Sequence, residues 1–458
     1  MIDLNKVNKI YFVGIGGIGI SAVAGIMHAR SFLVEGSDAV ETEIVNDLRE
    51  HQITIHVPHR AENIHNDIDL ICYSVAVPEN NPELIKANEL KIPLVTYPQL
   101  LGMLIQNKYG IGVSGTDGKT TTTAMLSKIL IDGGLDPTVV LGSKADFLED
   151  NWRIGDSKYF AFEADEYRRA FDNYLPKLAV ITNVGLDHLD YFKDQVDYLK
   201  AFKDYVKKIP KDGAVVINND NENSIAVGLK TSAKIITFAL NAQADYRAEI
   251  KEIKSGRQIF QVWEKGIDAG EFKLRLPGDY NVYNALAAIA TARTLEIPLD
   301  KIRQSLEEFK GAWRRWQSLG MCGQAEVIAD YAHTPDAVAK VIKAAKDFYP
   351  NKKIMTVFQP HQYARTKNLF SDFIKAFDGA EKVLLPDIFY VEGRENPADF
   401  DVSSEKLAEE IAARKVEVEA SGDLKMTEEK IRLLSDKYDV ILILGAGNIY
   451  EVAKNLAK

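Results

Sequence analysis

The chain has 458 residues, of which 46% are hydrophobic and 27% charged, and its formal net charge is -10. This length suits roughly three domains. The negative charge argues against general binding of nucleic acid or insertion at a membrane surface, because both need a net or clustered basic surface. Cys72 and Cys322 lie far apart with no metal-binding spacing, and the N-terminus has no long apolar segment. We therefore expect a reduced, cytoplasmic protein without a signal peptide.

Short β-rich segments alternate with amphipathic stretches of helical length. The segment KIYFVGI precedes an expected helix near residues 18–30, and LICYSVAV precedes another near residues 81–90. This alternation is typical of parallel sheets with crossover helices. The sequence therefore predicts an α/β protein with three domains: a Rossmann-like domain (1–108), a central domain like the P-loop ATPases with a mostly parallel sheet (109–310), and a second Rossmann-like domain (311–458).

A glycine-rich turn follows the first predicted strand. Residues 14–19 read GIGGIG, which contains the pattern GxGxxG between a strand and a helix. Glycines allow a tight turn here and let a diphosphate reach the N-terminus of the helix, where free N–H groups favour an anion. An NAD-dependent dehydrogenase would use Glu35 or Asp38 on a ribose, but no second motif for hydride transfer follows. A diphosphate ligand is the preferred interpretation, and glycines that merely allow close packing are the alternative.

The segment GTDGKTTTT, residues 115–123, follows the strand IGVSG and begins a helix. Backbone N–H groups in such a turn surround phosphates, while Lys119 adds a positive charge and the Thr120 hydroxyl can bind Mg²⁺. The usual phosphate-loop spacing would need a glycine where Val113 stands. The two glycines of GTDG supply the backbone freedom instead, so we predict a nucleotide site. Four threonines that merely cap a helix are the alternative.

Acidic residues follow the next strand, SKYFAF. Glu163, Asp165 and Glu166 crowd together in FEADEYRRAF, and carboxylates at strand ends facing a phosphate loop suit a magnesium site. We expect Glu163 to be the ligand and Glu166 to matter less; a solvated acidic loop is the alternative. His188 follows the strand AVITNV at the edge where α/β enzymes place their sites, although single histidines among acids are often structural.

Polar and basic residues also mark the last part of the chain. Asn281 lies in the first turn of the alanine-rich segment GDYNVYNALAAIATA, where its amide could cap the helix or contact a base. Arg315 in WRRWQ, Asp330 and His333 in ADYAHTPDA, and Arg365 in FQPHQYARTK follow at predicted strand ends. Guanidinium groups suit phosphate or carboxylate ligands, although each could be an ordinary surface charge.

Together these motifs resemble the Mur ligases, the ATP-dependent enzymes of cytoplasmic peptidoglycan precursor synthesis, over essentially the whole chain. The family's phosphate loop reads GTxGKT, which GTDGKT fits. Within the family the similarity is greatest to the branch that adds L-alanine to UDP-N-acetylmuramate, through VGIGGIGISAVA, EGSD, GTDGKTTTTAM, EADE, NVGLDH, DYAHTP and FQPHQYARTK.

Three features depart from that branch. Asp117 stands where it usually has histidine, Tyr280 replaces another histidine, and DYAHTPD is equally typical of the branch that adds meso-diaminopimelate or lysine, whose DNPR signature is missing. A ligase that attaches a preformed peptide to the same nucleotide sugar, or one that adds a different amino acid, therefore stays open. A non-catalytic nucleotide-binding regulator would lose Glu163 and His188, and both are present.

The resemblance implies a reaction and a set of residues. ATP with Mg²⁺ would phosphorylate the lactyl carboxylate of UDP-N-acetylmuramate, and the amine of L-alanine would then attack the acyl phosphate. The implied catalytic residues are Lys119, Glu163, His188, Arg365 as a clamp for the amino-acid carboxylate, and His333 as a possible proton acceptor. The implied metal ligands are Thr120 with Glu163 for one Mg²⁺ and His188 for a second. Lys200 or Lys203 could be the carbamylated lysine that several relatives carry.

The resemblance also assigns ligands to the three domains. The first would bind the UDP-sugar, the central one ATP, and the last the amino acid; we expect a monomer or homodimer. The implied ATP-binding residues are Gly115, Thr116, Asp117, Gly118, Lys119, Thr120, Thr121, Asn281, Arg315 and Asp330. The implied residues for uridine diphosphate are Gly14, Gly16, Gly17, Gly19, Ser37, Asp38, His59 and Ser74.

Overall fold

The computed structural model describes residues 2–148, 150–188, 191–254, 256–391 and 395–457. Its strands form three sheets. The chain divides into two compact units, which are described separately. Unit 1 contains Met1–Glu249, Gln261–Phe272 and Tyr283–Phe309, and unit 2 contains Ile250–Phe260, Lys273–Val282 and Lys310–Lys458.

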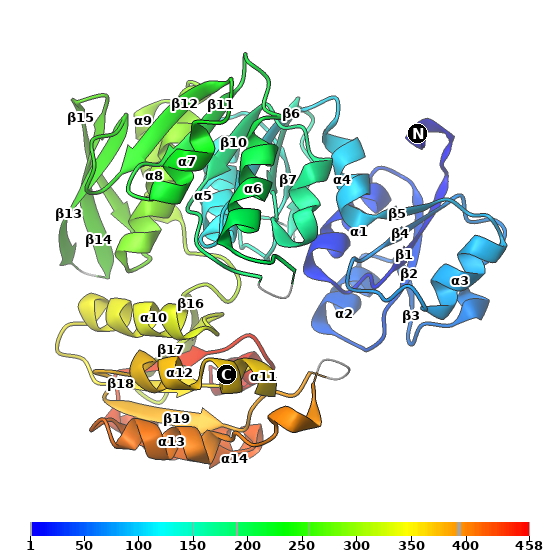
Figure 1. Ribbon diagram of the computed structural model, residues 1–458. Helices are drawn as coiled ribbons and strands as arrows, with labels where there is room; N and C mark the ends of the chain where they lie inside the picture. Colours follow the sequence, from blue (N-terminus) through cyan, green and yellow to red (C-terminus); the bar gives the residue numbers. More distant parts are fainter. Residues whose placement is uncertain (1, 149, 189–190, 255, 392–394, 458) are drawn as a thin grey trace. The chain divides into compact units, whose positions relative to one another are not determined.

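The first sheet has five strands in the order β3-β2-β1-β4-β5, and all its pairings are parallel. Figure 1 shows α3 on one face of this sheet and α1 and α4 on the other. The strands are β1 (Lys9–Val13), β2 (Leu33–Ser37), β3 (Thr54–His56), β4 (Leu70–Tyr73) and β5 (Leu94–Thr96). The helices are α1 (Ile18–Ala29), α2 (Glu43–Glu50), α3 (Pro82–Glu89) and α4 (Tyr97–Ile105).

Strand β1 explains why this sheet needs cover on both faces. Ile10 and Phe12 belong to the large core of unit 1, whereas Tyr11 and Val13 belong to a second cluster on the opposite face. Such a strand reads as a continuous hydrophobic run because neither face meets water. The strand order reverses between β1 and β4, and open α/β sheets bind ligands in the crevice at the carboxyl ends of such neighbours.

The second sheet has ten strands in the order β15-β14-β13-β12-β11-β10-β6-β9-β7-β8. Its strands are β6 (Tyr109–Ser114), β7 (Thr138–Val140), β8 (Trp152–Arg153), β9 (Tyr159–Glu163), β10 (Leu178–Ile181), β11 (Ala214–Asn218), β12 (Lys234–Ala239), β13 (Tyr246–Lys254), β14 (Arg257–Glu264) and β15 (Ile267–Leu274). The helices are α5 (Lys119–Asp132), α6 (Gln195–Val206), α7 (Glu222–Gly228), α8 (Asp279–Thr294) and α9 (Leu299–Glu308). Strand β6 lies between β9 and β10 and is parallel to both, so the loop after β6 opens at the carboxyl edge.

The third sheet, in unit 2, has six strands in the order β16-β17-β21-β18-β19-β20. Only β16 is antiparallel to its neighbour. Its strands are β16 (Gln317–Cys322), β17 (Ala325–Asp330), β18 (Ile354–Phe358), β19 (Lys382–Pro386), β20 (Glu417–Gly422) and β21 (Val440–Leu444). The helices are α10 (Pro335–Phe348), α11 (Tyr363–Asn368), α12 (Phe370–Ala376), α13 (Ser404–Ala412), α14 (Leu424–Leu434) and α15 (Ile449–Leu456).

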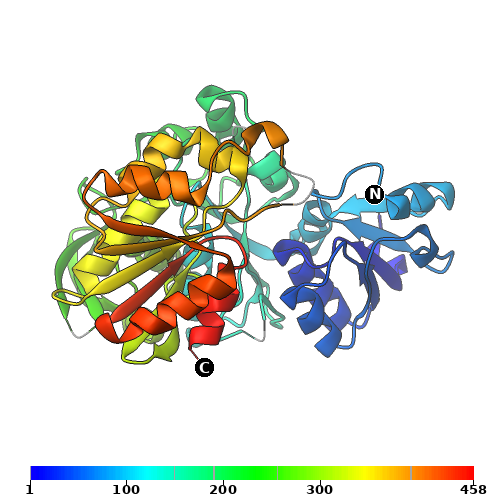
Figure 2. The same cartoon turned by 90° about the horizontal axis from the view of Figure 1, so that it is seen from below.

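Helices cover both faces of this third sheet. Helix α12 contacts α10 and α13, and α14 contacts α15, so the helices form two groups, with the strands between them in Figure 2. The predicted α/β class with mostly parallel sheets is confirmed, whereas the division of the chain at residues 108 and 310 stays a prediction. Within the part of the chain that the structure describes, no helix is both long enough and apolar enough to cross a membrane.

Candidate active site

The phosphate-loop segment forms a tight turn between β6 and α5. Gly115 and Gly118 have φ angles of 140° and 81°, which residues with a Cβ rarely adopt. A Cβ on Gly115 would lie 2.0 Å from Thr182 Oγ1, and one on Gly118 would lie 2.2 Å from Asn284 Oδ1. Both positions therefore require glycine. Val113, where the usual pattern has glycine, lies fully buried within β6 and needs no such freedom.

Lys119 is the first residue of α5, and its side chain turns back over the loop. Its Nζ donates to the carbonyl oxygens of Gly115 (2.6 Å) and Thr116 (3.0 Å) and to Glu166 Oε1 (3.0 Å). Burial alone would lower the pKa of Lys119, but the negative charge of Glu166 and its acidic neighbours raises the pKa above its ordinary value. The lysine therefore stays charged at the centre of the loop.

Glu166 connects this lysine to His188. His188 Nε2 lies 3.6 Å from Glu166 Oε1, which also accepts a hydrogen bond from the Tyr198 hydroxyl at 3.2 Å. Burial would raise the pKa of Glu166, but the charge of Lys119 and the hydrogen bond with His188 lower it. Glu166 Oε2 is buried and makes no hydrogen bond with any described residue. An orphaned carboxylate oxygen of this kind is costly unless a ligand completes it.

Asp165 completes a group that could hold a cation. One donor atom from each of Asp165, Glu166 and His188 lies within 4.8 Å of the others. Burial and the neighbouring Glu166 raise the pKa of Asp165. Two carboxylates and an imidazole with an unpartnered oxygen fit a divalent cation, which would also relieve the repulsion between the two acids.

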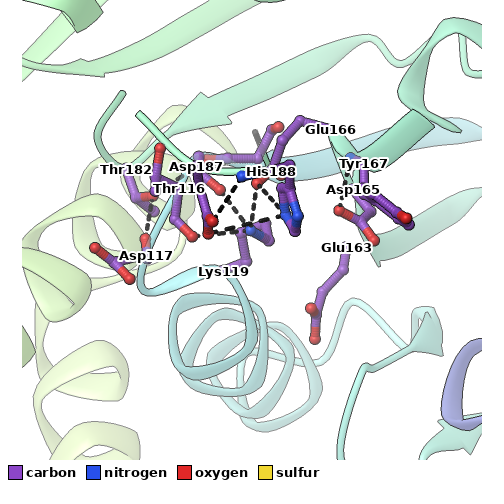
Figure 3. A network of polar contacts seen from close by, with 12 residues as sticks. Thr116, Asp117, Lys119, Glu163, Asp165, Glu166, Tyr167, Thr182, Asp187 and His188 are labelled. Atoms are coloured by element: carbon purple, nitrogen blue, oxygen red, sulfur yellow. Dashed lines mark hydrogen bonds and ion pairs between the residues drawn. The ribbon is translucent and has the colours of Figure 1, made fainter. Parts of the chain in front are cut away.

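Glu163 lies in a second, separate group. Thr120 Oγ1 donates to Glu163 Oε2 at 3.1 Å, and the Gly142 N–H donates to Glu163 Oε1 at 2.6 Å. Figure 3 shows the Glu163 carboxylate directed away from the cluster of Lys119, Glu166 and His188. The resemblance implied one Mg²⁺ at Thr120 with Glu163 and a second near His188. In the structure Thr120 lies beside Glu163, and His188 lies beside Glu166.

The sequence led us to expect that Glu166 matters less than Glu163. The structure shows Glu166 fully buried and in contact with Lys119, which no spacing within EADE reveals. The only hint in the sequence is the hydrophobic strand SKYFAF, which directly precedes these acids and shows that they lie at the end of a buried strand. Lys200, one of the two lysines that could be carbamylated, forms an ion pair with Asp204 at 2.7 Å on the exposed part of α6.

Asp117 is held in the turn by its backbone. Its carbonyl oxygen accepts from Thr182 Oγ1 (2.6 Å) and Asn183 Nδ2 (3.0 Å), and its N–H donates to Asn183 Oδ1 (3.1 Å). In Figure 3 its carboxylate points away from Lys119.

The glycine turn of the first sheet gathers the other predicted nucleotide residues. Gly14 has a φ of 76°, and a Cβ there would lie 3.1 Å from the Cβ of Ser74. Its N–H donates to the carbonyl oxygen of Ser37 at 2.8 Å, while Asp38 Oδ2 accepts from the Gly16 N–H at 2.8 Å. The carboxyl ends of β1, β2 and β4 therefore meet here, and the Asp38 carboxylate already binds the glycine turn.

A buried acid that the sequence analysis missed fixes two of these residues. Glu83, fully buried in the first turn of α3, accepts from Ser37 Oγ at 2.5 Å and lies 3.0 Å from His59 Nδ1. Its other oxygen accepts from Asn63 Nδ2 (2.7 Å) and the Tyr11 hydroxyl (3.1 Å). Burial would raise the pKa of Glu83, but the hydrogen bonds of His59, Ser37 and Asn63 lower it. An acid in a first helical turn usually reads as a surface charge, so the sequence carried no signal for this role.

Unit 2 holds the remaining predicted residues. Asp330 accepts from the Trp316 N–H (2.8 Å) and the Ala332 N–H (2.9 Å), and burial raises its pKa while Arg315 opposes that shift. The Arg315 guanidinium lies 4.9 Å from the centre of the Tyr331 ring. These contacts place Arg315 and Asp330 together at the end of β17.

A histidine pair joins this edge to the arginine of α11. His333 Nδ1 lies 3.0 Å from the carbonyl oxygen of Tyr331, and its ring centre lies 6.3 Å from that of His361. Arg365 Nη1 lies 3.0 Å from His361 Nδ1. Asn281 is engaged separately, since its amide donates to the carbonyl oxygen of Pro277 at 2.7 Å.

Three family models cover most of the chain. The Mur ligase family, catalytic domain matches residues 9–109, the Mur ligase middle domain matches residues 113–292, and the Mur ligase, glutamate ligase domain matches residues 314–447. Together with the phosphate loop, these matches define an ATP-dependent α/β ligase. The chain belongs to the Mur ligase family.

Curated relatives and solved structures match over nearly the full length. The chain is 38% identical to the UDP-N-acetylmuramate–L-alanine ligases of Caldanaerobacter subterraneus subsp. tengcongensis and Aquifex aeolicus, covering 99% of this chain and 98% of each relative. The crystal structure of the UDP-N-acetylmuramate-alanine ligase of Thermotoga maritima has a TM-score of 0.86, 32% identity and 98% coverage of both chains. A murein peptide ligase of Psychrobacter arcticus shares the fold, with a TM-score of 0.70 at 22% identity and 98% coverage of both chains.

Proposed function

We propose that this protein joins L-alanine to the lactyl carboxylate of UDP-N-acetylmuramate in the cytoplasm, with ATP and Mg²⁺. The observation that carries the proposal is the phosphate loop with the Lys119–Glu166 pair at its centre, in a chain whose full-length relatives are named for this reaction. ATP supplies the γ-phosphoryl group that activates the carboxylate, and Mg²⁺ neutralises phosphate charge.

Different residues around the phosphate loop bind the two Mg²⁺ ions and the phosphates of ATP. We assign one Mg²⁺ to Thr120 and Glu163, whose oxygens lie 3.1 Å apart, and a second to Glu166 and His188 with Asp165. Hard oxygen donors suit this ion. The carbonyl groups that hold Lys119 aim its charge at the loop, where phosphate charge must be stabilised during transfer.

The other predicted residues keep their proposed roles. Arg365 holds the carboxylate of the amino acid, since a guanidinium matches a carboxylate with two parallel hydrogen bonds. His333 accepts the proton that the attacking amine must lose. The glycine turn with Ser37, Asp38, His59 and Ser74 binds uridine diphosphate, while Asn281, Arg315 and Asp330 bind ATP together with Gly115–Thr121. A monomer or homodimer remains our expectation.

A phosphate-release assay tests the proposal. Purified protein is mixed with ATP, Mg²⁺, UDP-N-acetylmuramate and one of four amines: L-alanine, glycine, L-serine, or the tripeptide L-alanyl-γ-D-glutamyl-meso-diaminopimelate. We expect turnover to require all components and to be fastest with L-alanine, with the product's mass confirming the amide. Preference for the tripeptide would instead identify a peptide ligase of the same family.

A further inference from the structure

Two consecutive arginines follow the acidic cluster in an unusual backbone conformation. Arg168 has φ 49° and ψ 26°, and Arg169 has φ 57° and ψ 34°, so both lie in the left-handed region. Residues with a Cβ rarely occupy this region, and two in succession are rarer still. Strain of this kind is commonly retained where it places a side chain for function.

The two guanidinium groups have opposite surroundings. Arg169 forms ion pairs with Asp172 (2.7 Å) and Asp204 (3.2 Å), so its charge is compensated. Arg168 is exposed, and its Nη1 donates to the carbonyl oxygen of Val75 at 2.6 Å, while its guanidinium lies 5.5 Å from the centre of the Tyr167 ring. A carbonyl and an aromatic ring hold the Arg168 guanidinium without cancelling its charge. Arg168 is therefore a positioned cation within the described part of unit 1.

Val75 belongs to the loop that follows β4, at the place where the strand order of the first sheet reverses. This loop lies against the glycine turn, because a Cβ on Gly14 would be 2.9 Å from Val77 Cγ2 and 3.1 Å from Ser74 Cβ. The crevice between the ends of β1 and β4 is where such a sheet binds its ligand. Arg168 thus brings a positive charge to the edge of a crevice whose glycine turn leads into the N-terminus of α1.

The neighbour of Arg168 ties the same segment to the phosphate loop. The Tyr167 ring lies 4.7 Å from the ring of His188, centre to centre, and Glu166 contacts Lys119. One short segment therefore links the acidic cluster to the crevice of the first sheet. A ligand anion bound at Arg168 would be fixed with respect to the phosphate loop.

We propose that Arg168 binds the diphosphate of the nucleotide sugar. The inference rests on the proposed function for the presence of a nucleotide sugar in the first sheet. A guanidinium presents paired N–H donors that match phosphate oxygens, and the diphosphate is the part of the ligand that the glycine turn would hold. Arg168 exchanges its single carbonyl contact for this stronger, charge-assisted pairing.

The test uses glycine, because glycine adopts left-handed φ without strain and so keeps the backbone. We compare Arg168→Gly with Arg169→Gly, a matched control one residue along with the same backbone conformation. Binding of UDP, of UDP-N-acetylmuramate and of ATP to the full-length protein is measured by calorimetry. We expect Arg168→Gly to weaken UDP and UDP-N-acetylmuramate alike by about tenfold or more, the scale of a charge-assisted hydrogen bond, with ATP affinity unchanged.

Arg169→Gly should leave UDP affinity as in the wild type and instead lower the unfolding temperature, since it removes the ion pairs. Wild-type affinity for UDP in Arg168→Gly would overturn the inference. Weakening confined to UDP-N-acetylmuramate would also overturn the diphosphate assignment, because it would point to the lactyl carboxylate. Failure of the wild-type protein to bind either nucleotide would overturn the proposed function, and that result is distinct from the other two.

Discussion

Among the described residues of unit 1, Glu83 and Glu166 are both fully buried, but they differ in how completely their oxygens are hydrogen-bonded. Both oxygens of Glu83 are occupied, by Ser37 and His59 on one side and by Tyr11 and Asn63 on the other. Glu166 Oε1 accepts hydrogen bonds from Lys119 and Tyr198 and lies 3.6 Å from His188. Among the described residues, its Oε2 has no hydrogen-bond partner.

This difference distinguishes a scaffold from a reactive site. A saturated carboxylate stabilises the fold and fixes its neighbours, and nothing in its surroundings calls for a further ligand. A buried carboxylate oxygen without a hydrogen-bond partner costs free energy. A cation or substrate that binds beside the charged lysine would supply the missing partner. We therefore expect Glu83 to preorganise the first sheet and Glu166 to take part in the chemistry. Substitutions at the two sites should separate stability from turnover.

Lys119→Ala should have the largest effect, because Lys119 supplies the charge at the centre of the loop. Removing such a contact typically lowers turnover by about 10^2 to 10^3. The control is Lys128→Ala on the same helix, where the lysine pairs with Asp132 and plays no part in the loop. Steady-state phosphate release measures both variants. Near-normal turnover of Lys119→Ala would contradict the phosphate-loop assignment.

Arg365→Ala extends the comparison to unit 2 and should act on one substrate only. Loss of a charge-assisted pairing with the amino-acid carboxylate should raise KM for L-alanine by about tenfold or more, with a much smaller change in KM for ATP. Lys367→Ala is the control. Lys367 follows Arg365 by two residues and forms an ion pair with Asp401. Unchanged alanine kinetics in Arg365→Ala would remove Arg365 from the amino-acid site.

Glu163→Gln and Glu166→Gln should separate the two carboxylate groups of the active site. A neutral amide is a poorer ligand for a hard cation, so Glu163→Gln should raise the Mg²⁺ concentration needed for half-maximal turnover by about tenfold. The sequence led us to expect a smaller effect of Glu166→Gln on this requirement. Because Glu166 also contacts Lys119, its substitution should in addition lower kcat. A silent Glu163→Gln beside a Glu166→Gln with a strong Mg²⁺ effect would reverse these assignments.

Glu83→Gln tests the scaffold side of the comparison. The amide nitrogen would face groups that now donate to the carboxylate, so the unfolding free energy should fall by about 1–3 kcal/mol. Nucleotide-sugar affinity should fall with it, because Ser37 and His59 lose their fixed geometry, while kcat at saturating substrate stays close to that of the wild type. Glu89→Gln, on the exposed end of the same helix, provides the control. A fall in kcat at saturation without loss of stability would place Glu83 in the chemistry instead.

Much of this arrangement could be predicted from the sequence because it depends on local patterns. The alternation of buried strands and helices set the α/β class, and GIGGIG and GTDGKT marked turns in which Gly14, Gly115 and Gly118 have positive φ. The roles of Glu83 and Glu166 could not be predicted in this way. Burial of a carboxylate depends on partners far along the chain, such as Lys119 for Glu166 and Tyr11 for Glu83, and no spacing within EADE or NPEL reveals them.

Asp117→His should have the smallest effect, although an anion in a phosphate-binding turn opposes the charge of ATP. The turn is held by the backbone of Asp117, whose N–H and carbonyl oxygen bond to Thr182 and Asn183, and this role is independent of the side chain. The carboxylate points away from Lys119 in Figure 3, as expected if it faces a metal-bound water or the incoming substrate.

We therefore expect Asp117→His to keep turnover and KM for ATP within about threefold of the wild type, well below the cost of a lost oxyanion contact. Asp117→Pro, which removes the N–H that Asn183 accepts, is the informative contrast and should impair ATP binding. A nucleotide-bound crystal structure checks the geometry directly. Direct contact of the Asp117 carboxylate with the β- or γ-phosphate, with no cation between them, would contradict this placement. A large loss of turnover in Asp117→His would show that the carboxylate itself takes part in the reaction.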